Sequence, residues 1–175
     1  MANAIQKYFR YRKRLIDQYL KGDMTKSEYL DLNLEAVLSL RREPFKKIDT
    51  VEKGLFNYQY FNAMAKGARA ESFLYAEREL KKESSEAADY YYYKKDQSTL
   101  AVLRLINYKG VTAYFIAVRS KYLRGRLFEI VIDDYEMILH SASDVILNCL
   151  REENVFAEGI RTSIIDYYVN QRYEL

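Results

Sequence analysis

The sequence lacks tryptophan and is poor in proline, glycine and cysteine. Among its 175 residues are one Pro, six Gly and one Cys. Proline and glycine are the residues that most often interrupt helices and strands, so their scarcity predicts short turns and long regular elements. The lone cysteine, Cys149, excludes an internal disulfide. A chain of this length can nevertheless bury a core as one domain without disulfides or metal ions.

Long hydrophobic runs are also missing. No apolar stretch approaches the ~20 residues that a membrane-spanning helix needs. The first ten residues, MANAIQKYFR, have no apolar signal-peptide core ahead of their charges. We therefore expect a cytoplasmic protein with no membrane partner.

The motifs of the commonest enzyme classes are absent. There is no GxxxxGK phosphate loop, GxGxxG turn, GxSxG elbow or CxxC pair. The only histidine, His140, is close in sequence to Ser141, Ser143, Asp144 and Cys149, and a Cys–His pair with an orienting Asp can activate a thiolate. Cys149 falls on the apolar face of an expected helix, however, where a thiolate is disfavoured. We expect no catalytic residues and no enzyme.

A cluster of acids offers possible ligands for a cation. Asp133, Asp134 and Glu136 follow Glu129, and carboxylate oxygens bind hard cations such as Ca²⁺. The same acids fall where an expected strand ends, which is an ordinary place for solvated charge. We expect no metal, no cofactor and no small-molecule ligand. An enzyme would need a cleft that joins these acids to His140.

Helical patterns fill the first part of the chain. Apolar residues recur at helical spacing over residues 5–20, with Arg12 the one misfit on the apolar stripe. Gly22 follows this stripe and can end the helix in a left-handed conformation. A first helix is therefore predicted to end at this glycine.

Two capping boxes predict the next two helices. Thr25 and Glu28 have the spacing at which each side chain satisfies the other's free backbone amide, at the start of a helix over about residues 26–42. A similar pattern at 49–52 starts a third helix over about residues 50–82. Small residues in the middle of this third helix would let another helix approach closely. The alternative is that Gly67 marks a kink, because glycine inside a helix costs about 1 kcal/mol relative to alanine.

After residue 83 the pattern changes from helical to extended. Residues 83–89 resemble a linker, and the four tyrosines that follow suit a strand, which sends them alternately to two faces. Asn107 and Gly110 match a hairpin turn between two apolar runs. A helical structure for residues 98–108 remains the alternative, because short apolar runs do not distinguish helix from strand.

Together these patterns predict an α+β fold as one domain over residues 1–175. It comprises three N-terminal helices up to residue 83 and a four- to five-stranded antiparallel β-meander over about 89–140. Two C-terminal helices over about 143–173 are expected to pack on the sheet.

Positive charge is concentrated in two segments, although the net charge is only +3. Residues 1–14 and 98–128 contain bases without acids, whereas residues 129–175 contain ten acids and three bases. Aromatic residues alternate with these Lys and Arg residues. The positive charges could neutralise phosphates, and the aromatic rings could stack on nucleobases. The candidate nucleic-acid-binding residues are Lys7, Arg10, Arg14, Arg119, Lys121, Tyr122, Arg124 and Arg126.

A simpler explanation of these segments is that each is a solvated face, or that the second pairs with the acidic C-terminal segment. The pI of about 8.7 is modest for a nucleic-acid binder and favours this explanation. Nucleic-acid binding is therefore the alternative function.

The first hypothesis is a non-catalytic binding or regulatory protein that acts through protein–protein contacts. The chain has 18 tyrosines, and tyrosine is enriched at protein interfaces. On an edge strand, residues 90–93 would offer an edge that a second subunit could extend. The predicted partner is a second copy or another protein, with the interface at Tyr90, Tyr91, Tyr92 and Tyr93.

Overall fold

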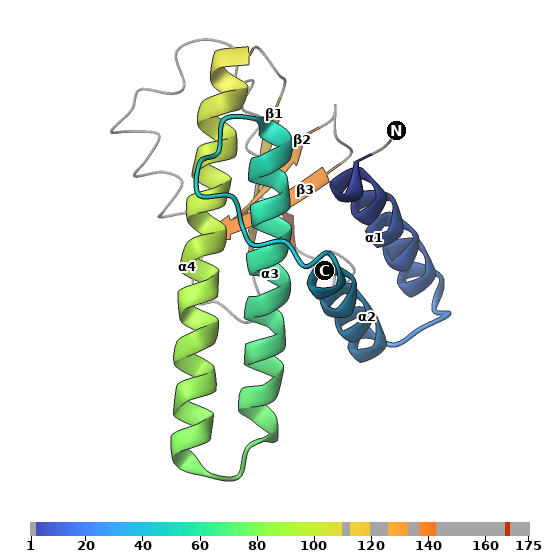
Figure 1. Ribbon diagram of the computed structural model, residues 1–175, viewed down its shortest axis with the longest axis vertical. Coiled ribbons are helices and arrows are strands. Elements are labelled where there is room, and N and C mark those ends of the chain that lie inside the picture. The colour runs from blue at the N-terminus through green and yellow to red at the C-terminus, as the bar shows by residue number, and fades with distance from the viewer. Residues whose placement is uncertain (1–2, 110–112, 120–125, 133–136, 143–166, 169–175) are drawn as a thin grey trace. The chain divides into compact units, whose positions relative to one another are not determined.

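The structure is a computed structural model that describes residues 3–109, 113–119, 126–132, 137–142 and 167–168. This part of the chain is mostly helical, with strands only from Ala113 onward (Figure 1). The helices are α1 (Ala4–Lys21), α2 (Lys26–Ser39), α3 (Val51–Leu74) and α4 (Arg78–Lys109), and the strands are β1 (Ala113–Arg119), β2 (Arg126–Ile132), β3 (Met137–Ala142) and β4 (Tyr167–Tyr168).

The chain divides into two compact units. The helical unit comprises Met1–Lys46 and Gln59–Lys95, and the sheet unit comprises Lys47–Tyr58 and Asp96–Leu175. The boundary falls inside two helices, so α3 and α4 each contribute to both units.

Both ends of the first helix are capped, and only the second cap was predicted. The side chain of Asn3 accepts a hydrogen bond from the amide of Gln6 at 3.0 Å and caps the start of α1. Gly22 ends α1 in the left-handed conformation with φ 83°, as predicted. Arg12 is buried on the apolar face of α1, and its Nε has no hydrogen-bond partner within the described residues.

The capping box of the second helix is confirmed. Thr25 Oγ1 accepts a hydrogen bond from the amide of Glu28 at 3.2 Å, and the amide of Thr25 donates to the Glu28 carboxylate at 2.7 Å. Helix α2 ends at Ser39, a few residues before the predicted end. The predicted capping box of α3 began at Asp49. In the structure the capping side chain is instead Thr50, whose Oγ1 accepts a hydrogen bond from the amide of Lys53 at 3.2 Å.

Small and aromatic side chains form the core of the helical unit. Tyr8, Val37 and Ala63 are buried together, and the Tyr8 hydroxyl donates to Asn33 Oδ1 at 3.0 Å. Helix α2 approaches α3 closely at Gly67, where a Cβ atom would lie 3.1 Å from Leu34 Cδ2. This contact agrees with the prediction that small residues in α3 admit another helix.

Helices α3 and α4 run antiparallel within the helical unit (Figure 1). Ser84 Oγ donates to the carbonyl of Ala68 at 2.7 Å. The Arg69 guanidinium donates to Ser85 Oγ at 2.8 Å and to Asp89 Oδ1 at 2.6 Å. These bonds tie the two helices together next to the turn at residues 75–77.

The sheet unit joins the first turns of α3 and the last turns of α4 to a four-stranded sheet of order β3-β2-β1-β4. Strands β1, β2 and β3 pair antiparallel, whereas β4 pairs parallel with β1. The hydroxyl of Tyr58 accepts a hydrogen bond from the amide of His140 at 2.7 Å and donates to its carbonyl at 3.3 Å. It thereby occupies backbone groups on the outer edge of β3, which an edge strand otherwise exposes.

The predicted α+β fold class is wrong, because the part of the chain that the structure describes is mostly helical. Residues 83–109 are not a linker followed by strands but belong to α4, a helix of 32 residues. The predicted turn at 107–110 is also wrong at Asn107, which lies in α4, while Gly110 lies outside the described residues. The third helix ends at Leu74, so the predicted helix over 50–82 is in fact two.

The physical reason is the composition of the buried stripe of α4. Ser84, Ala88, Lys95, Thr99 and Val102 are buried and recur every three, four or seven residues, as one face of a helix requires. Most of them are polar or small, so a search for apolar periodicity does not find this face. The apolar residues within 98–108, near the end of α4, therefore look like a strand in the sequence alone.

The predicted C-terminal helices are wrong where the structure describes that region. Residues 167–168 form β4, and the rest of the 143–173 range lies outside the described residues. In the described part of the chain, no helix combines the length and hydropathy needed to cross a membrane.

Candidate functional site

The predicted tyrosine interface lies on α4 rather than on an edge strand. Because successive residues of a helix turn by about 100°, the four tyrosines point in different directions. Tyr90 and Tyr93 are exposed, whereas the ring of Tyr91 stacks on Phe61 with centroids 6.4 Å apart. Tyr92 is half-buried beside Arg69, whose guanidinium lies 6.0 Å from the ring centre, and burial raises the pKa of its hydroxyl. The interface itself remains a prediction.

The two predicted basic clusters belong to different units. Lys7, Arg10 and Arg14 are exposed on α1 at spacings that place them on one face. Arg119 and Arg126 are opposite each other in the register of β1 and β2. The other three candidates, Lys121, Tyr122 and Arg124, lie outside the described residues. The nucleic-acid site therefore remains a prediction.

The residues considered for catalysis or metal binding are only partly described. Ser141 is buried and donates from Oγ to Asp96 Oδ1 at 2.7 Å, and the neighbouring His140 is half-buried in β3. Within the residues that the structure describes, no group of three or more His, Cys, Asp or Glu side chains could hold a metal ion. The remaining candidates lie outside that part of the chain: Asp133, Asp134, Glu136, Ser143, Asp144 and Cys149.

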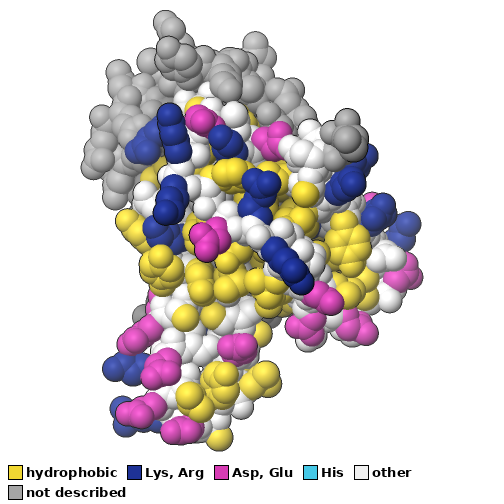
Figure 2. Space-filling model, in the orientation of Figure 1, with side chains coloured by type: hydrophobic (Ala, Val, Ile, Leu, Met, Phe, Trp, Pro, Cys, Tyr) yellow, Lys and Arg dark blue, Asp and Glu magenta, His cyan; other side chains and the backbone are white. Residues whose placement is uncertain are grey.

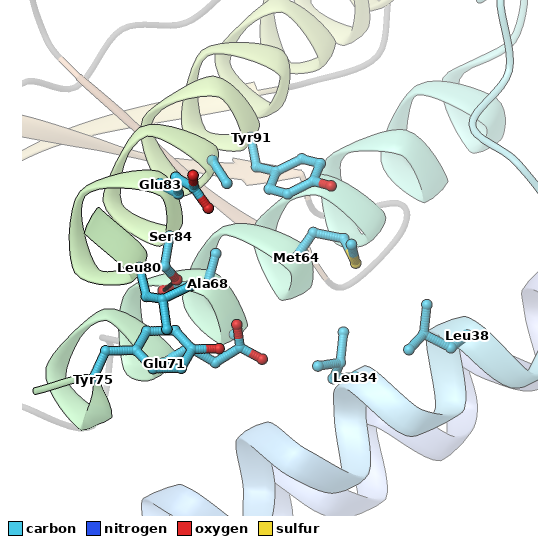
Figure 3. A pocket seen from close by; sticks show the side chains of 12 residues that line it. Leu34, Leu38, Met64, Ala68, Glu71, Tyr75, Leu80, Glu83, Ser84 and Tyr91 are labelled. Carbon is cyan, nitrogen blue, oxygen red and sulfur yellow. Dashed lines mark hydrogen bonds between the residues drawn. The ribbon is translucent and has the colours of Figure 1, made fainter. Parts of the chain in front are cut away.

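The helical unit contains a groove that sequence reasoning missed. It has a volume of about 440 Å³ and is formed by α2, α3, α4 and the turn between α3 and α4. Leu34 and Leu38 of α2 face the side chains of α3 and α4 across it (Figure 3). We call this the acidic groove, and its lining residues are Leu34, Leu38, Met64, Gly67, Ala68, Glu71, Tyr75, Leu80, Glu83, Ser84, Ala87 and Tyr91.

The lining of the acidic groove combines apolar walls with negative charge. Among the described residues that line it, Glu71 and Glu83 are the only charged ones, and both are exposed. Neither takes part in an ion pair among the described residues. Ser84 is already bonded to the backbone of α3. Such a lining would fit a partner whose surface is apolar and carries positive charge at its edge.

Large hydrophobic side chains are exposed near the same end of the hairpin. Phe73 is 75% exposed and Leu74 is 82% exposed, at the end of α3. Leu38, Tyr75 and Leu80, which line the acidic groove, are also exposed. Figure 2 shows hydrophobic side chains gathered near the α3–α4 turn, with acidic side chains around them.

A second hollow of about 390 Å³ lies along the same two helices and has the opposite charge. Of the described residues that line it, four are Lys or Arg and only Glu86 is acidic. We call this the basic face, and its residues are Arg69, Ser72, Phe73, Arg78, Lys81, Lys82, Ser85 and Glu86.

The sequence contains a signal for the acidic groove once α3 and α4 are known to be helices. Residues 64, 68 and 71 recur at helical spacing on α3, and residues 80, 83, 87 and 91 do so on α4. The strand prediction for residues 90–93 and the single helix predicted over 50–82 hid this pattern.

Comparison with known proteins gives a family but no function. One protein-family model matches residues 1–173, and its description is "Family of unknown function (DUF6648)". None of the curated proteins and none of the solved structures matches the chain.

Proposed function

The chain belongs to this family of unknown function, and we propose that it acts as a non-catalytic protein-binding module. The observation that supports this proposal is the acidic groove together with the exposed hydrophobic side chains beside it. Contiguous exposed apolar surface on a soluble domain commonly marks an interaction site.

Burial of this surface provides the driving force for binding. Fully burying one Leu side chain contributes about 1.5–3 kcal/mol relative to leaving it exposed. Leu38 and Leu80, which line the groove, could both gain from such burial, because each is more than one third exposed. An amphipathic helix is the common occupant of a groove between helices.

The charge of the groove defines the chemistry of the partner. Glu71 and Glu83 favour a partner that surrounds its apolar residues with Lys or Arg. An acidic partner would place like charges together and would be rejected. The expected partner surface is therefore apolar at its centre and basic at its edge.

Site-specific photo-cross-linking in cells tests the proposal. A photoreactive benzoylphenylalanine at Leu38, which lines the groove, should give a discrete protein adduct. The matched control is Leu32, an exposed leucine of α2 that does not line the groove. The double substitution Glu71→Lys, Glu83→Lys should abolish the adduct at position 38.

Glu77→Lys, Glu79→Lys is the charge control, because both acids are exposed and lie outside the groove lining. This control should leave the adduct unchanged. Equal cross-linking from positions 32 and 38, or none from either, would contradict a binding role for the groove.

Nucleic-acid binding is a second candidate, supported by two arrangements of bases. Lys7, Arg10 and Arg14 share one exposed face of α1, and Arg119 lies opposite Arg126 in the sheet. Binding to a generic oligonucleotide should weaken with salt, because phosphate contacts release counterions.

Two paired substitutions test the contribution of each cluster. Arg10→Ala with Arg14→Ala changes the helix cluster, and Arg124→Ala with Arg126→Ala changes the second one. Each pair should weaken binding and reduce its salt dependence. Absence of any binding at low salt would exclude this function.

A further inference from the structure

The two surfaces of the α3–α4 hairpin have opposite charge, and we propose that the basic face of one molecule docks into the acidic groove of a second copy. This inference rests on the proposed protein-binding function and identifies the partner as the chain itself.

The two surfaces lie on opposite sides of the hairpin. On α4, Leu80, Glu83 and Ala87 line the groove, whereas Arg78 and Lys82 belong to the basic face. With about 100° between successive residues, these two sets point roughly 180° apart. On α3 the same division separates residues 64, 68 and 71 from residues 69 and 73. One molecule can therefore use both surfaces at once.

The charges of the two surfaces match in number as well as in sign. On the basic face, Arg69 already pairs with Asp89 at 2.6 Å, and Lys82 lies 3.8 Å from Glu86. Arg78 and Lys81 take part in no ion pair among the described residues. These two cations correspond to the two carboxylates of the acidic groove.

Phe73 supplies the apolar anchor for this contact. It belongs to the basic face and is 75% exposed. Aromatic and arginine side chains are the residues that most often dominate interface energies when they enter a pocket. The groove offers apolar walls at Leu34, Leu38 and Met64. A phenylalanine flanked by Arg and Lys therefore has the chemistry that this groove selects.

The arrangement also determines the symmetry of the association. A twofold dimer formed groove to groove would bring Glu71 and Glu83 of both copies together, and like charges at an interface are costly. A contact between two different surfaces is heterologous and leaves one groove and one basic face open. It therefore continues until a ring closes or a chain forms.

Two variants of the full-length protein separate this contact from other modes of association. The groove variant is Glu71→Lys, Glu83→Lys, and the face variant is Phe73→Ala, Arg78→Ala, Lys81→Ala. Each keeps one surface intact. By light scattering, self-association of each variant alone should weaken about tenfold or more. The variant Glu77→Lys, Glu79→Lys should associate like the unchanged protein.

Mixing the two variants provides the decisive result. The intact basic face of the groove variant can enter the intact groove of the face variant. The remaining surfaces, a basic groove and a neutral face, do not match. The mixture should therefore form a 1:1 pair that does not grow, whereas the unchanged protein forms larger species. Circular dichroism of each variant checks that the helices remain folded.

Three results would overturn the inference. The first is that the unchanged protein is monomeric, and the second is that neither variant weakens its association. The third is that the protein forms a dimer that the groove variant loses and the face variant keeps. The cross-link from Leu38 then distinguishes the two proposals. If the purified protein is monomeric but the groove still cross-links to a different protein, the partner is not a second copy and the protein-binding function stands. If both fail, both proposals are wrong.

Discussion

The helical unit and the sheet unit differ in how far their large apolar side chains are exposed. Among the residues whose side chains the structure describes, the exposed large hydrophobic ones belong to the helical unit, from Leu20 to Tyr93. Most of the largest fully buried side chains belong to the sheet unit, namely Leu55, Phe56, Tyr58, Leu103, Ile130 and Leu139. We infer that the described side chains of the sheet unit contribute mainly to packing stability, whereas those of the helical unit also form exposed apolar surface.

The difference is clearest because α3 and α4 contribute to both units. The first turns of α3 bury Leu55 and Phe56, whereas its last turn exposes Phe73 and Leu74. Exposure therefore changes along a single helix of 24 residues. Four predictions test this contrast, from the largest expected effect to the smallest.

Core truncation should distinguish the two units most strongly. Leu55→Ala removes a side chain that is 0% exposed and should lower the free energy of unfolding by about 2–5 kcal/mol. Leu38→Ala, on the exposed groove wall, should change it by less than about 0.5 kcal/mol. Urea unfolding followed by circular dichroism measures both. Equal losses would contradict the contrast.

The two glycines inside α3 give a matched pair. At Gly54 an added Cβ would lie 2.5 Å from Val102 Cγ2 and 3.2 Å from Ile48 Cγ2. Gly54→Ala should therefore destabilise the protein by about 1–3 kcal/mol, despite a gain of about 1 kcal/mol in helix propensity.

Gly67→Ala is its control in the helical unit. Its Cβ would lie 3.1 Å from Leu34 Cδ2, the end of a side chain that borders the groove. A small shift of Leu34 relieves this contact, so the unfolding free energy should change little. Thermal unfolding of both variants tests whether Gly54→Ala is the more destabilising substitution. A larger loss of stability in Gly67→Ala would contradict this prediction.

The contact between Tyr58 and β3 should have a smaller effect. Tyr58→Phe removes the hydroxyl that bonds the amide and the carbonyl of His140. A loss of about 1–2 kcal/mol is expected, at about 1 kcal/mol for each hydrogen bond. Faster hydrogen exchange of the His140 amide should accompany it. Tyr93→Phe, which changes an exposed hydroxyl of the helical unit, should leave both measurements unchanged.

The smallest of the four effects is expected at alkaline pH, where the core of the helical unit should lose stability. Burial raises the pKa of the Tyr8 hydroxyl, while nearby Arg12 partly opposes this shift. The fold therefore favours neutral Tyr8, and this stability is complete below the unfolded pKa of about 10 and lost as pH rises above it.

The expected loss is about 1 kcal/mol at one pH unit above 10. Urea unfolding across this pH range measures it. Tyr8→Phe should reduce the slope, although it also removes the bond to Asn33. An unchanged slope in Tyr8→Phe would show that other tyrosines, such as the half-buried Tyr92, cause the alkaline loss.

Local signals were sufficient for the first two helices and insufficient for the fourth. Gly22, Thr25 and Glu28 act within a few residues of themselves, so their effect can be deduced from spacing alone. The buried face of α4 contains Ser84 and Lys95, which no apolar pattern reveals. The acidic groove was missed for the same reason, because its lining depends on which helices meet.

The sequence by itself determined the end of α1 at Gly22 and the capping box at the start of α2, since these follow from the conformational preferences of individual residues. Only the tertiary structure decided that residues 78–109 form one helix. Intrinsic propensities differ by less than about 1 kcal/mol per residue for most side chains, so burial against neighbouring elements decides between helix and strand. The same packing separated the acidic groove from the basic face, because opposite sides of a hairpin exist only once both helices are in place.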